Sequence, residues 1–240
     1  MTCLSAGKSF GLVMLITATA LTTLTVFPRP TRGQEQETAL DRQVRAFLES
    51  HRQVWRDMNV PAVDGQKLHD IIVEHGYTRA VEIGTSTGHS GIWIAWALSK
   101  TGGKLITIEI DERRHRQATA YFEEAGLSDY IDARLANAHE LVPELEGPFD
   151  FVFSDADKDW YTRYFEWMLP KLEVGGCFTA HNVRQQTAGG RYGGRGRGRG
   201  GQPGTDEFVQ ALLATENLDT TFYTSGSGLS VSFKLPPGRR

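Results

Sequence analysis

Cysteine is scarce in this sequence: Cys3 and Cys177 are the only two among 240 residues. They lie far apart, and Cys3 falls in a segment with the composition of a removable leader, which excludes a disulfide framework and a thiolate metal site. Net charge is also small, at −3, and gives no overall sign of a nucleic-acid partner. The content of 40% hydrophobic and 23% charged residues is ordinary for a soluble globular protein. The length suffices for one well-cored domain.

Residues 1–33 differ from the rest of the chain. Lys8 precedes the charge-free segment 10–27, and Pro28 and Pro30 follow it. This layout is typical of a signal peptide, and cleavage after Gly33 would remove three basic and no acidic residues, taking the net charge from −3 to −6. We therefore expect an exported protein, periplasmic or secreted. An uncleaved membrane anchor is the alternative, although five threonines make the segment weakly hydrophobic.

Residues 34–240 are expected to form one domain. Apolar residues recur at helical spacing over 37–58, and a second helix is expected to end at Gly76, so that 34–76 supply N-terminal helices. Short apolar runs then alternate with helical stretches, and the runs cover 80–83, 105–110, 130–135, 149–155 and 177–181. This alternation predicts an α/β fold with a Rossmann-like, mostly parallel sheet of seven strands and helices on both faces. The last two strands, 220–224 and 229–235, predict an antiparallel C-terminal hairpin.

The segment 187–204, TAGGRYGGRGRGRGGQPG, is rich in glycine and arginine. Its composition predicts a flexible surface loop. Arginines spaced by glycines with one tyrosine also resemble an RNA-binding segment. Because one short tract provides few phosphate contacts, we expect no stable nucleic-acid complex, and RNA stays an open alternative.

The stretch VEIGTSTGHSG, residues 81–91, is expected to form the turn after the first strand of the sheet. In an open parallel sheet the ligand crevice lies at the carboxyl ends of the strands, next to this turn. Gly84 and Gly88 allow close backbone approach, and a helix beginning near His89 points its free N–H groups at the same place. Glu109, at the end of the second strand, is placed to bind both hydroxyls of a ribose. The turn lacks the G-x-G-x-x-G spacing of dinucleotide-binding proteins. The carboxylate of Glu82 beside it is also unfavourable for a pyrophosphate and favourable for a cation. We therefore expect a nucleoside with a cation nearby rather than a dinucleotide.

Polar residues crowd the expected ends of the fourth and fifth strands. Asp155 and Lys158 belong to FSDADKDWY, and His181 and Asn182 belong to AHN. Because neighbouring strand ends meet at one edge, Asp155, His181 and Asn182 can converge on one divalent cation. Lys158 beside such an ion is a candidate base. We therefore predict an active site at this edge.

In this combination the sequence resembles the S-adenosylmethionine-dependent O-methyltransferases of the catechol and caffeoyl-CoA type. The resemblance covers about residues 60–183 and the final strands, GSGLSVSFK, and the family pattern D-A-D-K-D-x-Y is matched in full over 155–161. It implies that the first-strand turn surrounds the methionine part of the cofactor, that a strand-end acid binds its ribose and that the loop 137–140 lies on its adenine side. The implied cofactor-binding residues are Glu82, Gly84, Thr85, Gly88, Ser90, Glu109, Ala138, His139 and Asp155.

The same resemblance implies transfer of the sulfonium methyl group to a hydroxyl of a small, catechol-like acceptor with help from a divalent metal. Lys158 and Asp155 would be catalytic, and Asp155, His181 and Asn182 would bind the metal. Relatives have Asp-Asn where this chain has His181-Asn182, and the exchange disfavours magnesium and favours manganese, iron, nickel or zinc, or else marks a lost metal. The acceptor and the oligomeric state, including a homodimer, are left open.

Two other classes of protein compete with this hypothesis. The first is a nucleoside-binding protein without methyl transfer, whose Arg/Gly loop binds RNA or another partner. The second is an NAD-dependent oxidoreductase, which the missing fingerprint in the 81–91 turn disfavours. Export also conflicts with a cofactor that is made in the cytoplasm, and an anchor with the domain facing inward would remove that conflict.

Overall fold

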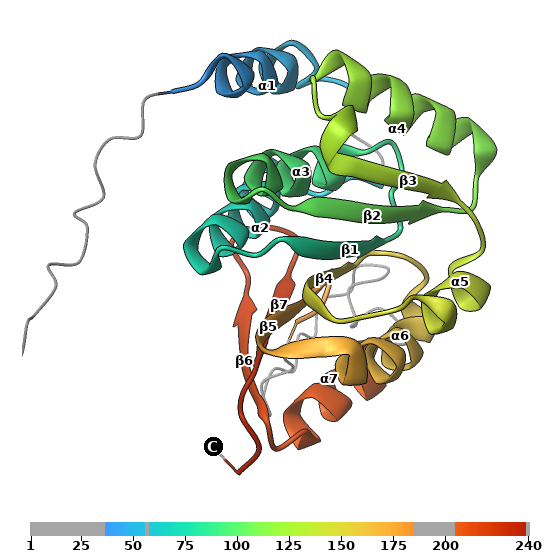
Figure 1. Ribbon diagram of the computed structural model, residues 1–240. Helices are drawn as coiled ribbons and strands as arrows, with labels where there is room; N and C mark the ends of the chain where they lie inside the picture. The colour runs from blue at the N-terminus through green and yellow to red at the C-terminus, as the bar shows by residue number, and fades with distance from the viewer. Residues whose placement is uncertain (1–36, 56–57, 185–204, 239–240) are drawn as a thin grey trace, which may run out of the picture. The chain divides into compact units, whose positions relative to one another are not determined.

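The computed structural model describes residues 37–55, 58–184 and 205–238, so the predicted leader and the predicted 187–204 loop lie outside the described residues. Seven strands form one sheet in the order β3-β2-β1-β4-β5-β7-β6 (Figure 1). Only β7 runs antiparallel to its neighbours, β5 and β6, while the other pairs are parallel. The predicted fold class is therefore confirmed. The strands are β1 Arg79–Ile83, β2 Lys104–Glu109, β3 Ile131–Leu135, β4 Phe149–Ser154, β5 Leu172–His181, β6 Leu218–Tyr223 and β7 Leu229–Lys234.

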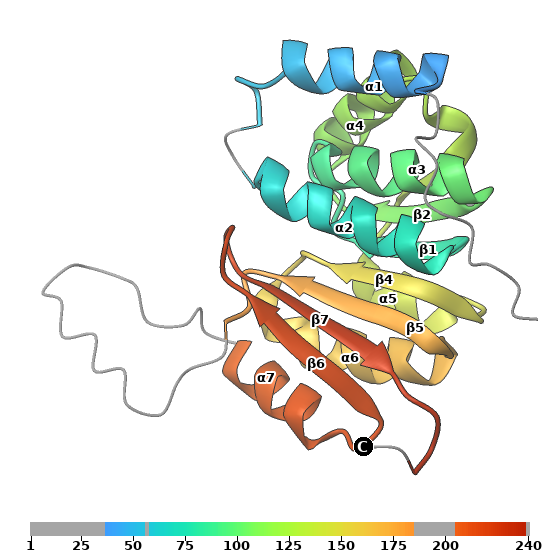
Figure 2. The ribbon, with the colours of Figure 1, turned by 90° about the vertical axis from the view of Figure 1, so that its left-hand side faces the viewer.

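Helices cover both faces of the sheet (Figure 2). The first group comprises α1 Ala39–Ser50, α2 Ala62–His75, α3 His89–Thr101 and α4 Glu112–Glu124. The second, on the opposite face, comprises α5 Ala138–Glu144, α6 Tyr161–Met168 and α7 Thr205–Ala214. Three short 3-10 segments complete the described elements: η1 Ser128–Tyr130, η2 Lys158–Trp160 and η3 Leu169–Lys171.

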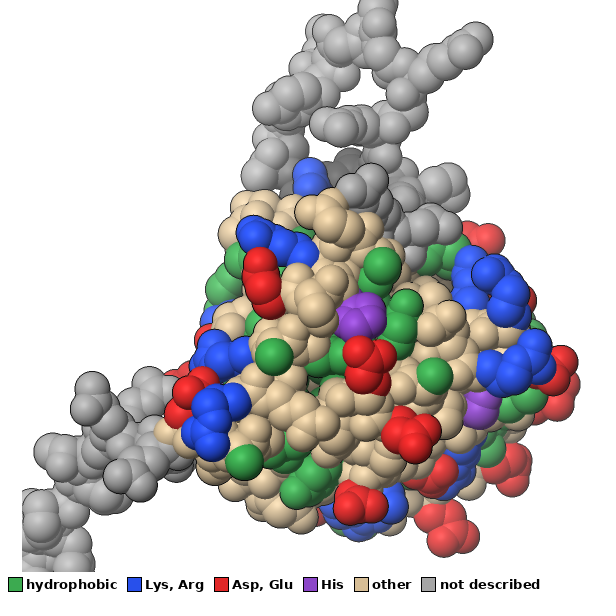
Figure 3. Space-filling model, turned by 90° about the horizontal axis from the view of Figure 1, so that it is seen from above, with side chains coloured by type: hydrophobic (Ala, Val, Ile, Leu, Met, Phe, Trp, Pro, Cys, Tyr) green, Lys and Arg blue, Asp and Glu red, His purple; other side chains and the backbone are tan. Residues whose placement is uncertain are grey.

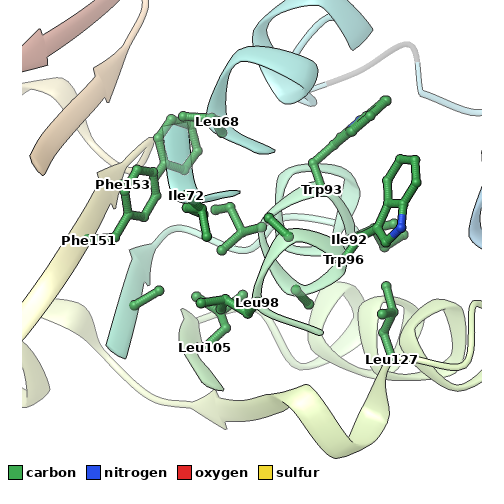
Figure 4. Packing of buried hydrophobic residues seen from close by; sticks show 14 of the residues in the cluster. Leu68, Ile72, Ile92, Trp93, Trp96, Leu98, Leu105, Leu127, Phe151 and Phe153 are labelled. Atoms are coloured by element: carbon green, nitrogen blue, oxygen red, sulfur yellow. The ribbon is translucent and has the colours of Figure 1, made fainter. Parts of the chain in front are cut away.

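The core has two layers because side chains alternate across the sheet. On β4, Phe151 and Phe153 pack with α2 and α3, whereas Val152 packs with α6 and α7. Figure 4 shows the first layer, where Leu68 and Ile72 of α2 face the phenylalanines of β4. Each layer excludes water from one face of the parallel strands, as a sheet of this kind requires.

The first helix is shorter than predicted from residues 37–58. It spans Ala39–Ser50; Thr38 is the N-cap, whose side chain forms a capping box with that of Asp41, and His51 is the C-cap. The chain then turns, and Trp55 stacks on His89 of α3 with ring centroids 4.6 Å apart. Tertiary packing of this tryptophan therefore overrides the helical spacing of the sequence. The second helix ends as predicted, at Gly76 in the left-handed conformation.

The surface around α1 and α4 carries charges of both signs. Figure 3 shows acidic and basic side chains interspersed over this face, and Arg116 pairs with Glu112 along α4. None of the helices in the described part of the chain combines the length and apolar character needed to cross a membrane.

Candidate active site

The turn after β1 brings the carboxyl ends of three strands together. The N–H groups of Gly84 and Thr85 both donate to the carbonyl of Ile108 on β2, each at 3.1 Å. Gly84 has φ +97°, and a Cβ there would lie 2.6 Å from the carbonyl oxygen of Asp155. Glycine is therefore needed at position 84 for the close approach of β1 to the residue after β4. Gly88, with φ +98°, is the N-cap of α3.

A chain of polar groups lies beneath this turn. Thr85 shares a 2.5 Å hydrogen bond with Thr107, and Thr107 donates to Glu82. Glu82 is fully buried, and burial raises its pKa to about 8 although hydrogen bonds from Ser90 and Thr107 act in the opposite direction. The carboxyl group is therefore mostly protonated at neutral pH. Among the predicted ligand residues, the hydroxyl of Thr85 is hydrogen-bonded to Thr107 and that of Ser90 to Glu82.

Three buried polar atoms near the ends of β1 and β4 have no hydrogen-bond partner among the described residues. They are Oε1 of Glu82, Oγ of Ser86 and Oγ of Ser154. Buried polar groups are nearly always satisfied in folded proteins, so these three atoms are candidates for hydrogen bonds with an ordered water or a ligand. Ser86 also has a left-handed backbone, with φ +50°, and such residues concentrate at functional sites.

The Glu109 side chain is held by the backbone at the tip of β2. It accepts hydrogen bonds from the N–H groups of Ser86 at 2.7 Å, Asp111 at 2.9 Å and Ile110 at 3.1 Å. A carboxylate has about four lone-pair positions, so capacity remains for a ligand hydroxyl. Glu109 thus lies against the glycine turn, as the sequence predicted.

The expected adenine-side loop begins α5. Asn137 caps the helix by accepting from the N–H of His139 at 3.0 Å, with Ala138 between them. The His139 ring stacks on Trp160 with centroids 3.6 Å apart and contacts Asp157 at 2.9 Å. His139 therefore joins the β3–α5 loop to the segment after β4, a contact that no local sequence pattern predicts.

Lys158 lies in a partly buried hydrogen-bond network. Its ammonium group donates to Asp155 Oδ1 at 2.7 Å and to the Tyr161 hydroxyl. That hydroxyl donates in turn to the carbonyl oxygen of His181 at 3.1 Å. Burial holds the pKa of Tyr161 well above its usual range, so it remains a neutral phenol. Lys158, Asp155 and the end of β5 are thus brought together, as predicted.

The His181 ring is clamped between two carboxylates. Nδ1 lies 2.9 Å from Asp155 Oδ2, and Nε2 lies 3.1 Å from Asp64 Oδ2. Asp64 comes from α2, is 2% exposed and also accepts from the N–H of Ser227 at 2.9 Å. Sequence reasoning missed Asp64. A signal existed, because Asp64 stands four residues before Leu68 and so lies on the apolar face of its helix.

Opposite charges hold the clamp together. Burial lowers the pKa of His181, but the hydrogen bonds and charges of Asp155 and Asp64 outweigh it and raise the value to about 9. Burial acts to raise the pKa values of Asp64 and Asp155, yet their hydrogen bonds with His181 leave both below the usual range. His181 is therefore an imidazolium between two carboxylates at neutral pH.

The predicted metal ligands are neighbours, but their donors do not fit a divalent ion. Asp155 contacts His181 directly, and Asn182 follows with a left-handed backbone, φ +59°. Each ring nitrogen of His181 faces a carboxylate, so neither has a free lone pair to offer. Across the described ranges, no three His, Cys, Asp or Glu side chains are grouped to hold an ion.

The fold and the strand-end site define a Rossmann-like protein of the methyltransferase type: seven strands with one antiparallel, a glycine turn after β1 and an acid at the tip of β2. The chain belongs to the O-methyltransferase family, whose model matches residues 33–188. The family resemblance of the sequence is thereby confirmed.

Curated relatives match part of the chain. A catechol O-methyltransferase of Niastella koreensis is 41% identical over 107 residues, which are 43% of this chain and 48% of the relative. Tricin synthase 1 of Oryza sativa subsp. japonica is 32% identical over 66% of this chain and 63% of its own length. The chain thus spans between about half and two thirds of these relatives.

Solved structures match more of the chain. The O-methyltransferase TomG from Streptomyces achromogenes, in complex with SAM, has a TM-score of 0.67 and 27% identity, covering 82% of this chain and 91% of its own. An O-methyltransferase from Bacillus cereus, in complex with SAH, has a TM-score of 0.66 and 27% identity over 81% and 91% of the two chains.

Proposed function

We propose that this protein transfers the methyl group of S-adenosylmethionine to a hydroxyl of a small, catechol-like acceptor. The observation that carries the proposal is the Glu109 carboxylate, held by three backbone N–H groups against the glycine turn. Membership of the O-methyltransferase family supports it, as do two similar structures that hold SAM and SAH. The cofactor supplies an electrophilic sulfonium methyl group.

The chain offers suitable groups for this cofactor. Glu109 would bind the ribose hydroxyls, and the turn after β1, whose close packing depends on Gly84 and Gly88, would lie against the methionine part of the cofactor. The unpaired atoms of Ser86 and Ser154 would be satisfied by polar groups of the ligand. Ala138 and His139 are proposed for the adenine side by resemblance to the family.

Catalysis would rest mainly on alignment of the acceptor oxygen with the methyl group, which can contribute ~7–11 kcal/mol. Lys158 is the proposed catalytic group. In the present geometry its ammonium group is a donor to Asp155, so it would stabilise the negative charge that develops on the acceptor oxygen while the hydroxyl proton passes to solvent water. Asp155 would orient Lys158.

Export through the leader stays a prediction, and the metal-assisted reaction that the resemblance implies is not part of this proposal. The donor set described above does not fit an ion, so no catalytic step is assigned to one. The leader lies outside the described residues.

Calorimetric titration with S-adenosylmethionine and assay of methyl transfer to a panel of phenols test the proposal. We expect Lys158→Ala to lower kcat by about 10²–10³-fold, the usual range for loss of one donor that stabilises developing negative charge, with cofactor affinity unchanged. Lys104→Ala is the matched control, because Lys104 is exposed at the opposite end of β2.

Three results separate the hypotheses. Absence of cofactor binding at millimolar concentration would reject the proposed function. Binding without turnover on any phenol would favour the nucleoside-binding alternative. Full turnover by Lys158→Ala would leave the reaction in place and remove Lys158 from it.

A further inference from the structure

The side chain of His181, one of the predicted metal ligands, is enclosed between two carboxylates. Its ring is 4% exposed and lies between Asp155, which follows β4, and Asp64 of α2. An ionised carboxylate can only accept hydrogen bonds, so contacts of 2.9 and 3.1 Å require a proton on each ring nitrogen. A nitrogen that carries a proton cannot ligate a metal.

Charge in this cluster is balanced without an ion. Asp64 and Asp155 are negative, and His181 and Lys158 are positive. A buried ionic group is tolerated when it is paired and hydrogen-bonded, and all four groups meet that condition. A divalent cation would add two positive charges to a neutral cluster, and it would have to displace His181 or Lys158 from Asp155.

The geometry of the ring also keeps the two carboxylates apart. Its nitrogens point in diverging directions, so Asp155 and Asp64 lie on opposite sides of it. They therefore cannot converge on one ion while the ring stands between them. Gly226 packs so tightly against Asp64 that a Cβ there would lie 2.1 Å from Oδ1, which leaves the carboxylate little freedom to turn.

We propose that this protein transfers methyl groups without a divalent ion, and that the His181 side chain, clamped between Asp64 and Asp155, takes the position of the predicted metal. Asp64 is then a positioning residue, which acts by holding His181 against Asp155. The inference rests on the proposed function. It departs from the metal-assisted reaction that the family resemblance implies.

Metal binding by the full-length protein tests the inference directly. We expect elemental analysis of the dialysed protein to find no stoichiometric metal, titration with Mn²⁺ to show no binding at micromolar concentration, and EDTA to leave methyl transfer unchanged. His181→Asp places a third carboxylate beside Asp64 and Asp155, and this variant should bind Mn²⁺ at least about tenfold more tightly than the natural protein. Gln117→Asp adds a carboxylate on the exposed face of α4 and is the matched control.

A second variant tests the same inference if His181→Asp does not fold. Asp64→Asn combined with His181→Asp removes one of the three adjacent negative charges and should also bind Mn²⁺. Stoichiometric metal in the natural protein, or loss of its activity in EDTA, would overturn the inference. So would equal Mn²⁺ affinity in the natural protein and both His181 variants.

Nitrogen-15 NMR tests the positioning role of Asp64. The natural protein should show hydrogen-bonded protons on both ring nitrogens of His181 at neutral pH, and Asp64→Asn should lose the Nε2 proton signal and lower kcat without changing cofactor affinity. An unprotonated ring nitrogen in the natural protein would contradict the clamp. Cofactor titration of the same samples keeps the tests separate: bound cofactor together with bound metal rejects this inference alone, whereas failure to bind cofactor rejects the proposed function.

Discussion

At the residue scale, two glutamates at neighbouring strands have opposite surroundings. Glu82 is bonded by side-chain hydroxyls and keeps one oxygen unpaired within the described residues, and burial raises its pKa to about 8. Glu109 accepts three backbone hydrogen bonds. The sequence indicated an acid at each place, but it could not show that burial favours the protonated form of one carboxyl group and that backbone N–H groups surround the other.

Replacement of Glu109 should weaken cofactor binding. A hydrogen bond to a charged group contributes about 1.5–3 kcal/mol, so Glu109→Ala should lower affinity for S-adenosylmethionine by about ten- to a hundredfold in calorimetric titration. Glu112→Ala, at an exposed carboxylate near the start of α4, should leave it unchanged. Equal losses in both variants would contradict a specific role for Glu109.

Glu82 should make stability fall as pH rises. Its pKa is near 4.5 when unfolded and about 8 when folded, so between these values the folded state binds more protons than the unfolded state. The contribution of Glu82 is therefore fully present below about pH 4.5 and is lost as pH rises toward 8. Glu82→Gln removes this titration. In urea unfolding at several pH values, the free energy of unfolding of the variant should rise relative to that of the natural protein as pH increases across this window. A difference that does not change with pH would contradict the assignment.

At the scale of elements, the sequence predicted the strands and the glycine turn well because apolar runs and glycines mark them locally. It also placed Asp155, Lys158, His181 and Asn182 at one edge, since parallel strands end together. It missed Asp64 and the early end of α1, because both depend on contacts with segments distant in sequence: Asp64 with His181 and Ser227, and Trp55 with His89.

The close approach of β1 to the residue after β4 gives a prediction about glycine. Gly84→Ala should destabilise the protein by about 1–3 kcal/mol through overpacking, in addition to the cost of its left-handed backbone, and should weaken cofactor binding. Gly102→Ala is matched, because Gly102 is also left-handed, with φ +77°, but a methyl group added there would meet no neighbour within 4 Å among the described residues. Denaturant unfolding should rank Gly84→Ala as the less stable variant, and the reverse order would show that crowding at the turn is unimportant.

At the scale of the whole molecule, β4 is the central strand of the sheet that separates the two apolar layers, and the residues after its carboxyl end belong to the site. Phe151 is fully buried in the layer under α2 and α3. Phe151→Ala should lower the free energy of unfolding by about 3–5 kcal/mol. Val174→Ala, at an exposed position on β5, should change it little. Urea denaturation measures both, and a small loss for Phe151→Ala would mean that the layer can collapse around the gap.

The Asp64 contacts bear on the order in which the chain is completed during synthesis. Asp64 lies near the amino end of the described residues, yet its donors are His181 and Ser227. A nascent chain that has extended only as far as α6 would have to leave this acid in water. The ribosome must therefore extend the polypeptide through Ser227 before Asp64 can form its contacts with both His181 and Ser227.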